Sequence, residues 1–154
     1  MMKLCSEVLE ALAGKTLVTA ESLTGGGIGS ALTAVSGASA VYKGGVISYT
    51  NEVKQGILGV PEELLEIHGA VSAPVAEAMA MGARKLLDAD VAVSVTGLAG
   101  PGGDDYGNPV GTVFIGYADG EKSLFVHRVF SGSRQQIRQQ TIEAALKLVL
   151  EQNR

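Results

Sequence analysis

Ser22 stands directly before a glycine-rich turn and is the residue best placed for nucleophilic chemistry. Gly25–Gly27 fall where a helix is expected to begin, so backbone amides there could stabilise an oxyanion or bind another anion. A structural role is the alternative, because serine is a common helix cap and glycines permit a tight turn. A nucleophilic serine also needs a base, so the catalytic interpretation depends on a second group.

Lys54 and Tyr49 are the candidates for that group, since no histidine lies near Ser22 in the sequence. Lys54 is expected in the first turn of a short helix at Glu52–Leu58, capped by Asn51, where the helix dipole disfavours an ammonium group. Partial burial would lower the pKa of Lys54 further and leave a neutral amine as base. Tyr49 could relay a proton to a leaving group. The alternative is a solvated Lys54 and a Tyr49 that only ends a strand.

Strands and helices that could position these residues alternate along the chain. The expected strands are Thr16–Ala20, Gly44–Tyr49, Val91–Val95, Thr112–Ala118 and Ser123–Phe130, the last two joined by a hairpin turn at Asp119–Gly120. The further expected helices are one that ends at Gly14, one that reaches about Val35, one from Pro61 to Gly69, Ala73–Leu87 capped by Ser72, and a final helix capped by Ser133. This order predicts an α/β fold, a three-layer α/β/α sandwich with a mostly parallel sheet, in a single domain spanning 1–154.

Three loops with unusual composition follow the first three strands. They are Thr19–Gly27, Tyr49–Lys54 and Thr96–Gly103. In an open parallel sheet, ligands bind beyond the carboxyl ends of the strands, where the strand order reverses. We therefore expect these loops to converge on one site.

The composition excludes several classes of protein. The net charge of −4 argues against a nucleic-acid-binding protein with a basic face, and it leaves room for a small anionic ligand at one loop. Cys5 is the only cysteine, so no internal disulfide can form, and with two histidines there is little material for a zinc site. No segment has the length of a membrane span, and the amphipathic N-terminal segment does not resemble a signal peptide. These features predict a cytoplasmic protein without membrane or nucleic-acid partners.

Two motifs suggest cofactors or metals but do not fit. The glycine-rich segment Thr24–Ser30 looks like a dinucleotide fingerprint, yet Ser30 occupies the last glycine position and no acid lies between Glu21 and Glu52 to bind a ribose. Asp104 and Asp105 could hold a cation, although adjacent loop acids commonly face water. We therefore expect no metal and no cofactor.

Several segments together resemble the CinA C-terminal family, which includes stand-alone nicotinamide-nucleotide amidases. The matching segments are Thr19–Gly26, Gly44–Val60, Gly69–Ser72, Thr96–Gly103, Gly111–Thr112 and Arg134–Arg138. Leu23 is a departure, because the family commonly has cysteine at that position. The resemblance covers nearly the whole chain. It implies a mixed five-stranded sheet, a homodimer or larger assembly, and metal-free hydrolysis of nicotinamide mononucleotide to nicotinate mononucleotide and ammonia.

The resemblance also implies roles for individual residues. The family's catalytic serine, tyrosine and lysine match Ser22, Tyr49 and Lys54, and its loop threonine matches Thr96. The residues expected to bind the nucleotide are Thr24, Gly25, Gly26, Thr96, Gly97, Gly100, Arg134 and Arg138. Arg134, Arg138 and the Gly25–Gly27 turn remain open alternatives for the phosphate. A non-catalytic nucleotide-binding module and an amidase for another small amide are the alternative functions.

Overall fold

The computed structural model describes all of residues 1–154 and contains five strands, six α-helices and one short 3-10 helix. The strands are β1 (Leu17–Glu21), β2 (Tyr42–Ile47), β3 (Val91–Gly97), β4 (Thr112–Ala118) and β5 (Ser123–Val129). The helices are α1 (Met2–Ala11), α2 (Gly27–Thr33), α3 (Asn51–Gly56), α4 (Glu62–His68), α5 (Ala73–Leu86) and α6 (Arg134–Asn153), with the 3-10 helix at Ala38–Ala40.

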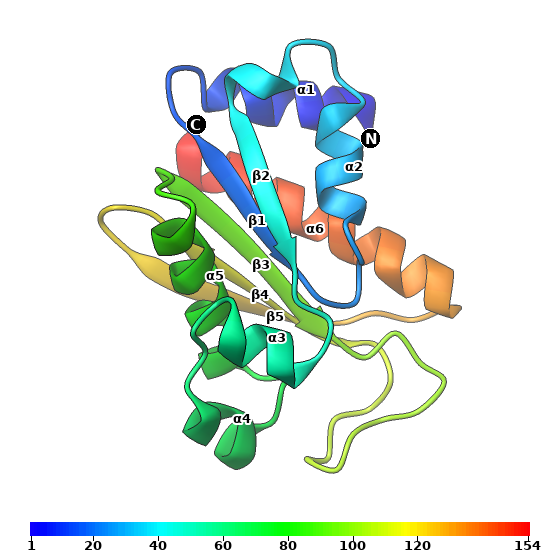
Figure 1. Cartoon of the computed structure of the whole chain (residues 1–154). Coiled ribbons are helices and arrows are strands. Elements are labelled where there is room, and N and C mark those ends of the chain that lie inside the picture. Colours follow the sequence, from blue (N-terminus) through cyan, green and yellow to red (C-terminus); the bar gives the residue numbers. More distant parts are fainter.

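The strands form one mixed sheet in the order β2-β1-β3-β4-β5 (Figure 1). β1 pairs in parallel with β2 and with β3, whereas β4 runs antiparallel to β3 and to β5. The chain passes from β1 to β2 on one side and then crosses to β3 on the other, so the strand order reverses at β1. This arrangement confirms the expected α/β fold and the hairpin of β4 and β5.

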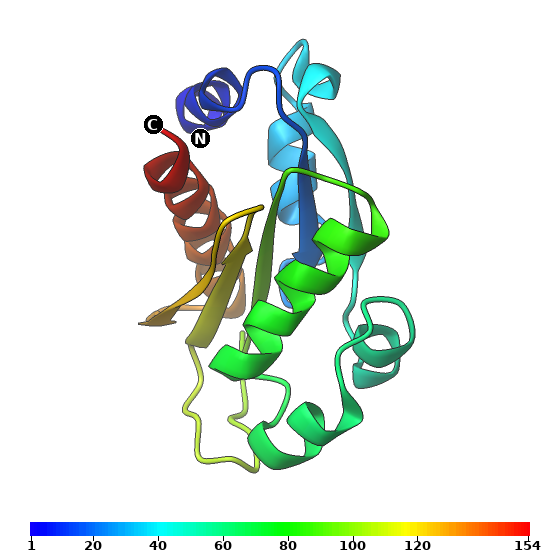
Figure 2. The same cartoon turned by 90° about the vertical axis from the view of Figure 1, so that its left-hand side faces the viewer.

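Helices cover both faces of the sheet, so the fold has three layers with the sheet in the middle. Figure 2 shows α5 on one face and α1, α2 and α6 on the other. Every residue of β1 is buried, and so are six of the seven residues of β3, as expected for central strands covered on both sides. The apolar content of these strands thus follows from the two helical layers.

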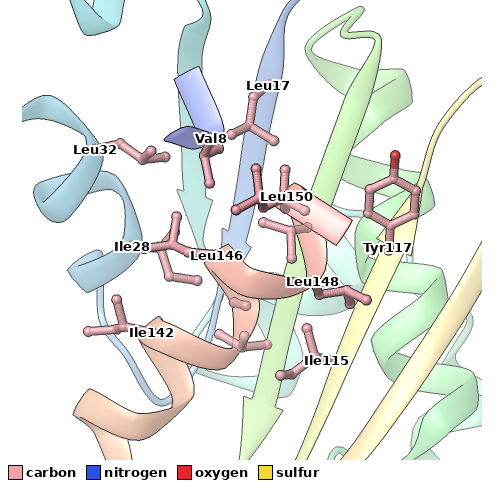
Figure 3. Packing of buried hydrophobic residues seen from close by; sticks show 14 of the residues in the cluster. Val8, Leu17, Ile28, Leu32, Ile115, Tyr117, Ile142, Leu146, Leu148 and Leu150 are labelled. Carbon is pink, nitrogen blue, oxygen red and sulfur yellow. The ribbon is translucent and has the colours of Figure 1, made fainter. Parts of the chain in front are cut away.

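The core is divided by the sheet into two clusters. The larger one has 22 buried residues and lies under α1, α2 and α6, with Val8, Ile28 and Leu146 among its members (Figure 3). Burying a side chain such as Leu146 contributes roughly 1.5–3 kcal/mol. The smaller cluster of 12 residues lies under α5. There α5 approaches β4 so closely that a Cβ at Gly116 would overlap the carbonyl oxygen of Ala76.

Three of the predicted helix caps can be compared with the structure. Ser133 caps α6 as predicted, since its hydroxyl accepts from the amide of Gln136 at 3.2 Å and a capping box is complete. Ser72 precedes α5, but its hydroxyl donates to the carbonyl of Gly69 and caps nothing. α3 starts one residue earlier than expected because Thr50 is its cap, not Asn51. No helix is both long and apolar enough to cross a membrane.

Candidate active site

A pocket of about 340 Å³ lies beyond the carboxyl ends of β1, β2 and β3. Figure 1 shows α3 and the loop after β3 at this end of the sheet. The residues that line the pocket are Ser22, Leu23, Tyr49, Asn51, Lys54, Ala70, Val71, Thr96, Gly97, Leu98, Ala99, Gly100, Gly102 and Arg134. All three predicted loops contribute to this list, so their convergence at the reversal of strand order is confirmed.

Ser22 and Lys54 are in direct contact inside this pocket. Ser22 directly follows β1, and its amide donates to the carbonyl of Val95 at 3.1 Å, which fixes the serine beside β3. The Nζ of Lys54 donates to the Oγ of Ser22 at 3.1 Å. Only 6% of Ser22 and 2% of Lys54 are exposed. The alternative of a solvated surface lysine is therefore excluded.

The amine of Lys54 is buried without a negatively charged partner. Its Nζ also donates to the carbonyls of Ser48 at 2.9 Å and Tyr49 at 3.2 Å, and no carboxylate pairs with it. Burial lowers the pKa of Lys54 from 10.5 to about 8. A neutral amine has a lone pair that can accept the hydroxyl proton of Ser22.

The position of Lys54 in its helix differs from the predicted one. Lys54 lies in the last turn of the six-residue α3, not near the start of a longer helix. Its amine reaches back to the carbonyls of Ser48 and Tyr49, which precede the helix. Removal from water is the cause of the lowered pKa of Lys54.

Tyr49 lies at the mouth of the pocket, with 59% of its surface exposed. Its hydroxyl accepts from the guanidinium of Arg134 at 3.3 Å, and the same guanidinium donates to the carbonyl of Gly100 at 2.6 Å. Residue 49 thus contacts Lys54 through its carbonyl and contacts Arg134 through its hydroxyl. A proton relay through the Tyr49 hydroxyl stays a prediction.

The turn after Ser22 presents free backbone donors. The amides of Leu23 and Thr24 donate to no acceptor in the protein, whereas the amide of Gly25 donates to the carbonyl of Ser22 at 3.1 Å. Gly25 and Gly26 have φ values of 56° and 100°, which are strained for any residue with a Cβ. The glycines therefore shape the turn, and the two free amides beside Ser22 are the candidates for an oxyanion hole.

Arg138 holds this turn from α6. Its guanidinium donates to the carbonyls of Leu23 at 2.9 Å and Thr24 at 3.2 Å, and it is not among the residues that line the pocket. Arg134 does line the pocket, one helical turn away. Of the two arginines, only Arg134 lines the pocket.

The loop after β3 forms the opposite wall. Thr96, Gly97 and Gly100 all line the pocket, and the hydroxyl of Thr96 donates to the carbonyl of Ala70 at 2.8 Å. A Cβ at Gly97 would come within 2.8 Å of the carbonyl of Thr112 and 3.2 Å of the Leu23 side chain. Gly97 therefore lets β3, β4 and the Ser22 turn meet closely.

The rest of this loop is fastened to α4 and to the segment between α4 and α5. The hydroxyl of Tyr106 donates to the carbonyl of Glu66 at 2.7 Å, and the side-chain amide of Asn108 donates to the carbonyl of Val71 at 3.1 Å. The carboxylate of Asp104 accepts from the amides of Tyr106 and Asn108, so it shapes the loop. No group of three or more potential metal-ligating side chains converges anywhere in the protein.

Sequence reasoning missed two contributors to the site. The wall formed by Ala70 and Val71 comes from the connection between α4 and α5. The only signal for it in the sequence was the resemblance of Gly69–Ser72 to the CinA C-terminal family. Glu21 was assigned to a loop, yet it ends β1 and is 2% exposed. Its carboxylate accepts from the amides of Ile28 and Gly29 at the start of α2. An acid at the end of an apolar run was the signal that could have revealed it.

Fold and site together define a three-layer α/β domain with a buried serine–lysine pair at the carboxyl edge of its sheet. The model of the CinA C-terminal domain family matches residues 1–153. The chain belongs to this family.

Named relatives and solved structures agree with this assignment. The nicotinamide-nucleotide amidohydrolase PncC of Escherichia coli is 43% identical over 155 residues, covering 99% of this chain and 94% of that protein. A CinA-like protein of Synechococcus is 60% identical over 114 residues, which are 73% of this chain and 27% of that protein. The chain covers only 27% to 34% of the CinA-like relatives it matches.

Two crystal structures show how closely the fold is shared. A CinA superfamily protein from Klebsiella pneumoniae has a TM-score of 0.95 and 33% identity, with 98% of this chain and 96% of that chain covered. A competence/damage-inducible protein from Agrobacterium tumefaciens has a TM-score of 0.94 and 38% identity, with 99% and 95% covered. The fold predicted from the sequence is thus confirmed by comparison as well.

Proposed function

We propose that this protein is a serine amidase that hydrolyses the carboxamide of nicotinamide mononucleotide to nicotinate mononucleotide and ammonia. The observation that carries the proposal is the contact between the buried amine of Lys54 and the hydroxyl of Ser22. The full-length likeness to an amidohydrolase that acts on a nicotinamide nucleotide supports the choice of substrate.

In the first half-reaction, neutral Lys54 takes the hydroxyl proton of Ser22 as the serine oxygen attacks the carboxamide carbon. A carbon–oxygen bond forms, and the carbonyl electron pair moves onto the oxygen. The free amides of Leu23 and Thr24 stabilise that oxyanion. When the intermediate collapses, the carbon–nitrogen bond breaks and the proton held by Lys54 passes to the leaving nitrogen, which departs as ammonia.

In the second half-reaction, water hydrolyses the ester on Ser22. Lys54 takes a proton from the water as its oxygen attacks the ester carbon, and the same amides stabilise the second oxyanion. Breaking the bond to the Ser22 oxygen returns the proton to the serine and releases the carboxylic acid, which loses its own proton to water and leaves as the carboxylate. Tyr49 is proposed to assist proton transfer from the pocket mouth, where substrate binding would bring its hydroxyl toward the leaving nitrogen.

Arg134 is proposed to bind the phosphate of the nucleotide. It is the arginine that lines the pocket, and its guanidinium contacts a neutral hydroxyl and a carbonyl, not a carboxylate. Arg138 and the Gly25–Gly27 turn are less suited, because their polar groups are largely engaged within the protein. Thr96 and Gly97 would hold the nucleotide from the opposite wall.

The setting of the reaction is part of the proposal. The single thiol, Cys5, is buried and free, which suits a reducing cytoplasm. A homodimer or larger assembly follows from the family resemblance. These assignments are independent of the chemistry at Ser22.

The test is incubation of purified protein with nicotinamide mononucleotide without added metal, with ammonia and nicotinate mononucleotide quantified together. We expect equal amounts of both products from the wild type and none from Ser22→Ala. Arg134→Gln should raise KM by about tenfold or more, because it removes charge-assisted hydrogen bonds worth about 1.5–3 kcal/mol. Ammonia release that survives in Ser22→Ala would contradict the mechanism. Binding without turnover in the wild type would favour the non-catalytic module, and activity only on another carboxamide would change the substrate.

A further inference from the structure

Glu21 is a buried carboxylate that faces no cation. It is the last residue of β1, directly before Ser22, and only 2% of its surface is exposed. The single ion pair of the protein joins Lys147 to Glu143 on α6, so no lysine or arginine neutralises Glu21. Burying a carboxylate is unfavourable unless hydrogen bonds replace its hydration. The donors to Glu21 therefore show what this carboxylate holds in place.

Three donors supply these hydrogen bonds, and all come from the segment that follows Ser22. One carboxylate oxygen accepts from the hydroxyl of Thr24 at 2.5 Å and from the amide of Ile28 at 2.8 Å. The other oxygen accepts from the amide of Gly29 at 3.1 Å. Amides in the first turn of a helix have no acceptor within that helix. Glu21 therefore ties both the Ser22 turn and the start of α2 to the end of β1.

The main chain of the same residue contacts the loop that leads to Lys54. The carbonyl of Glu21 accepts from the amide of Ser48 at 2.7 Å and from its hydroxyl at 3.3 Å. The carbonyl of Ser48 in turn accepts from the Nζ of Lys54 at 2.9 Å. The position of Ser22 relative to Lys54 thus depends on residue 21 through two separate sets of hydrogen bonds.

We propose that Glu21 is a positioning residue of the active site. Its side chain holds the turn that keeps the Ser22 hydroxyl at the amine of Lys54 and the free amides of Leu23 and Thr24 beside the nucleophile. This inference rests on the proposed amidase function. Glu21 is not among the residues that line the pocket, so it acts through the turn and not by touching substrate. Loosening the turn should slow the chemical step more than it weakens binding.

Glu21→Gln is the variant that tests this role, because it keeps the shape of the side chain and replaces one acceptor oxygen by a group that repels the amide donors. We expect kcat for ammonia release to fall about 100-fold, since a displacement of about 1 Å can have an effect of that order. KM should change little. Tyr117→Phe is the matched control, because it removes partly buried hydrogen bonds of a β4 residue outside the pocket. It should lower stability and leave kcat unchanged, with circular dichroism confirming that both variants are folded.

A second measurement separates this proposal from the amidase proposal. A fluorophosphonate forms an oxygen–phosphorus bond with an activated serine and loses fluoride, so mass spectrometry can follow its reaction with Ser22. We expect Glu21→Gln to slow this labelling by about the same factor as kcat. Wild-type labelling without ammonia release would end the amidase proposal, and the labelling rates would still decide the role of Glu21.

The proposal is overturned if folded Glu21→Gln labels and turns over at the wild-type rate, or loses no more than Tyr117→Phe. It is also overturned if the wild type neither labels nor releases ammonia, because there is then no activated serine to position.

Discussion

Two side chains with polar ends, Lys54 and Tyr117, are the largest that the fold buries completely, and they lie at different places along the sheet. Lys54 reaches the carboxyl ends of the parallel strands, where its amine contacts the hydroxyl of Ser22. Tyr117 lies in β4, where its hydroxyl donates to Asp119 at 2.9 Å and accepts from Asn153 at 3.1 Å. In Figure 3 this hydroxyl is at the end of the ring that points away from Leu148 and Ile115.

The same physical cause acts on both groups and has opposite consequences for reactivity. Burial disfavours the charged form, so it lowers the pKa of Lys54 to about 8 and raises the pKa of Tyr117 to about 12. The pKa of the lysine moves toward neutral pH, so its amine becomes a usable base. The pKa of the tyrosine moves away from neutral pH, so its hydroxyl stays a neutral hydrogen-bonding group. What distinguishes a reactive site from a structural one is therefore the direction of the pKa change and the partner within reach.

Of the two buried side chains, we expect the larger effect from changing the reactive one, by Lys54→Met. We expect kcat for ammonia release to fall about 1000-fold, because a general base typically contributes 10²–10⁴-fold. Stability should change little, since removing a buried amine offsets the loss of its hydrogen bonds. Ammonia release and urea unfolding measure the two quantities. A folded variant that keeps wild-type activity would contradict the assignment of Lys54 as base, and one that unfolds would contradict the expected stability.

The pH dependence of stability sharpens the same comparison. Lys54 has a lower pKa in the folded state than its ordinary value of 10.5, so the unfolded chain binds more protons between pH 8 and 10.5. Its contribution to the free energy of unfolding therefore rises by about 3 kcal/mol across that window and is lost as the pH falls back through 8. Tyr117 has the opposite sign: its raised pKa gives stability that is complete below pH 10 and lost as the pH rises toward 12.

Urea unfolding at a series of pH values checks these signs. The difference between the wild type and Lys54→Met should grow in favour of the wild type from pH 8 to 10.5, because only the wild type has this lysine. Activity should rise with pH up to about 8 and then level off, as the base becomes neutral. A flat stability difference across the window would show that Lys54 titrates normally.

Much of the fold could be predicted from the sequence because its signals are local. The apolar runs of β1 and β3, the turn at Asp119–Gly120 and the cap at Ser133 act through neighbouring residues, and the structure has each of them. The convergence of the three loops followed from the parallel connections alone. These features need no knowledge of which side chains meet.

The details of the site depend on contacts between distant segments, which the sequence does not encode locally. The burial of Lys54 goes with its contact with Ser22, 32 residues earlier in the chain. Arg134 and Arg138 are one turn apart on α6 and were equal candidates for the phosphate, yet only Arg134 lines the pocket. The role of Glu21 depends on α2 folding back onto the strand that precedes it. Such distinctions arise only in three dimensions.

The smallest effect is expected from changing the structural one of the two buried side chains, by Tyr117→Phe. This variant keeps the buried ring and removes the hydroxyl that joins Asp119 to Asn153. We expect the free energy of unfolding at pH 7 to fall by about 1 kcal/mol, the typical contribution of such a hydrogen bond. The alkaline loss of stability between pH 10 and 12 should shrink with it, because the titrating group is gone. Ammonia release should be unchanged, since no atom of Tyr117 reaches the pocket. A fall in kcat without a fall in stability would mean that the two buried side chains are coupled through the sheet, and that burial alone does not separate the reactive region from the structural one.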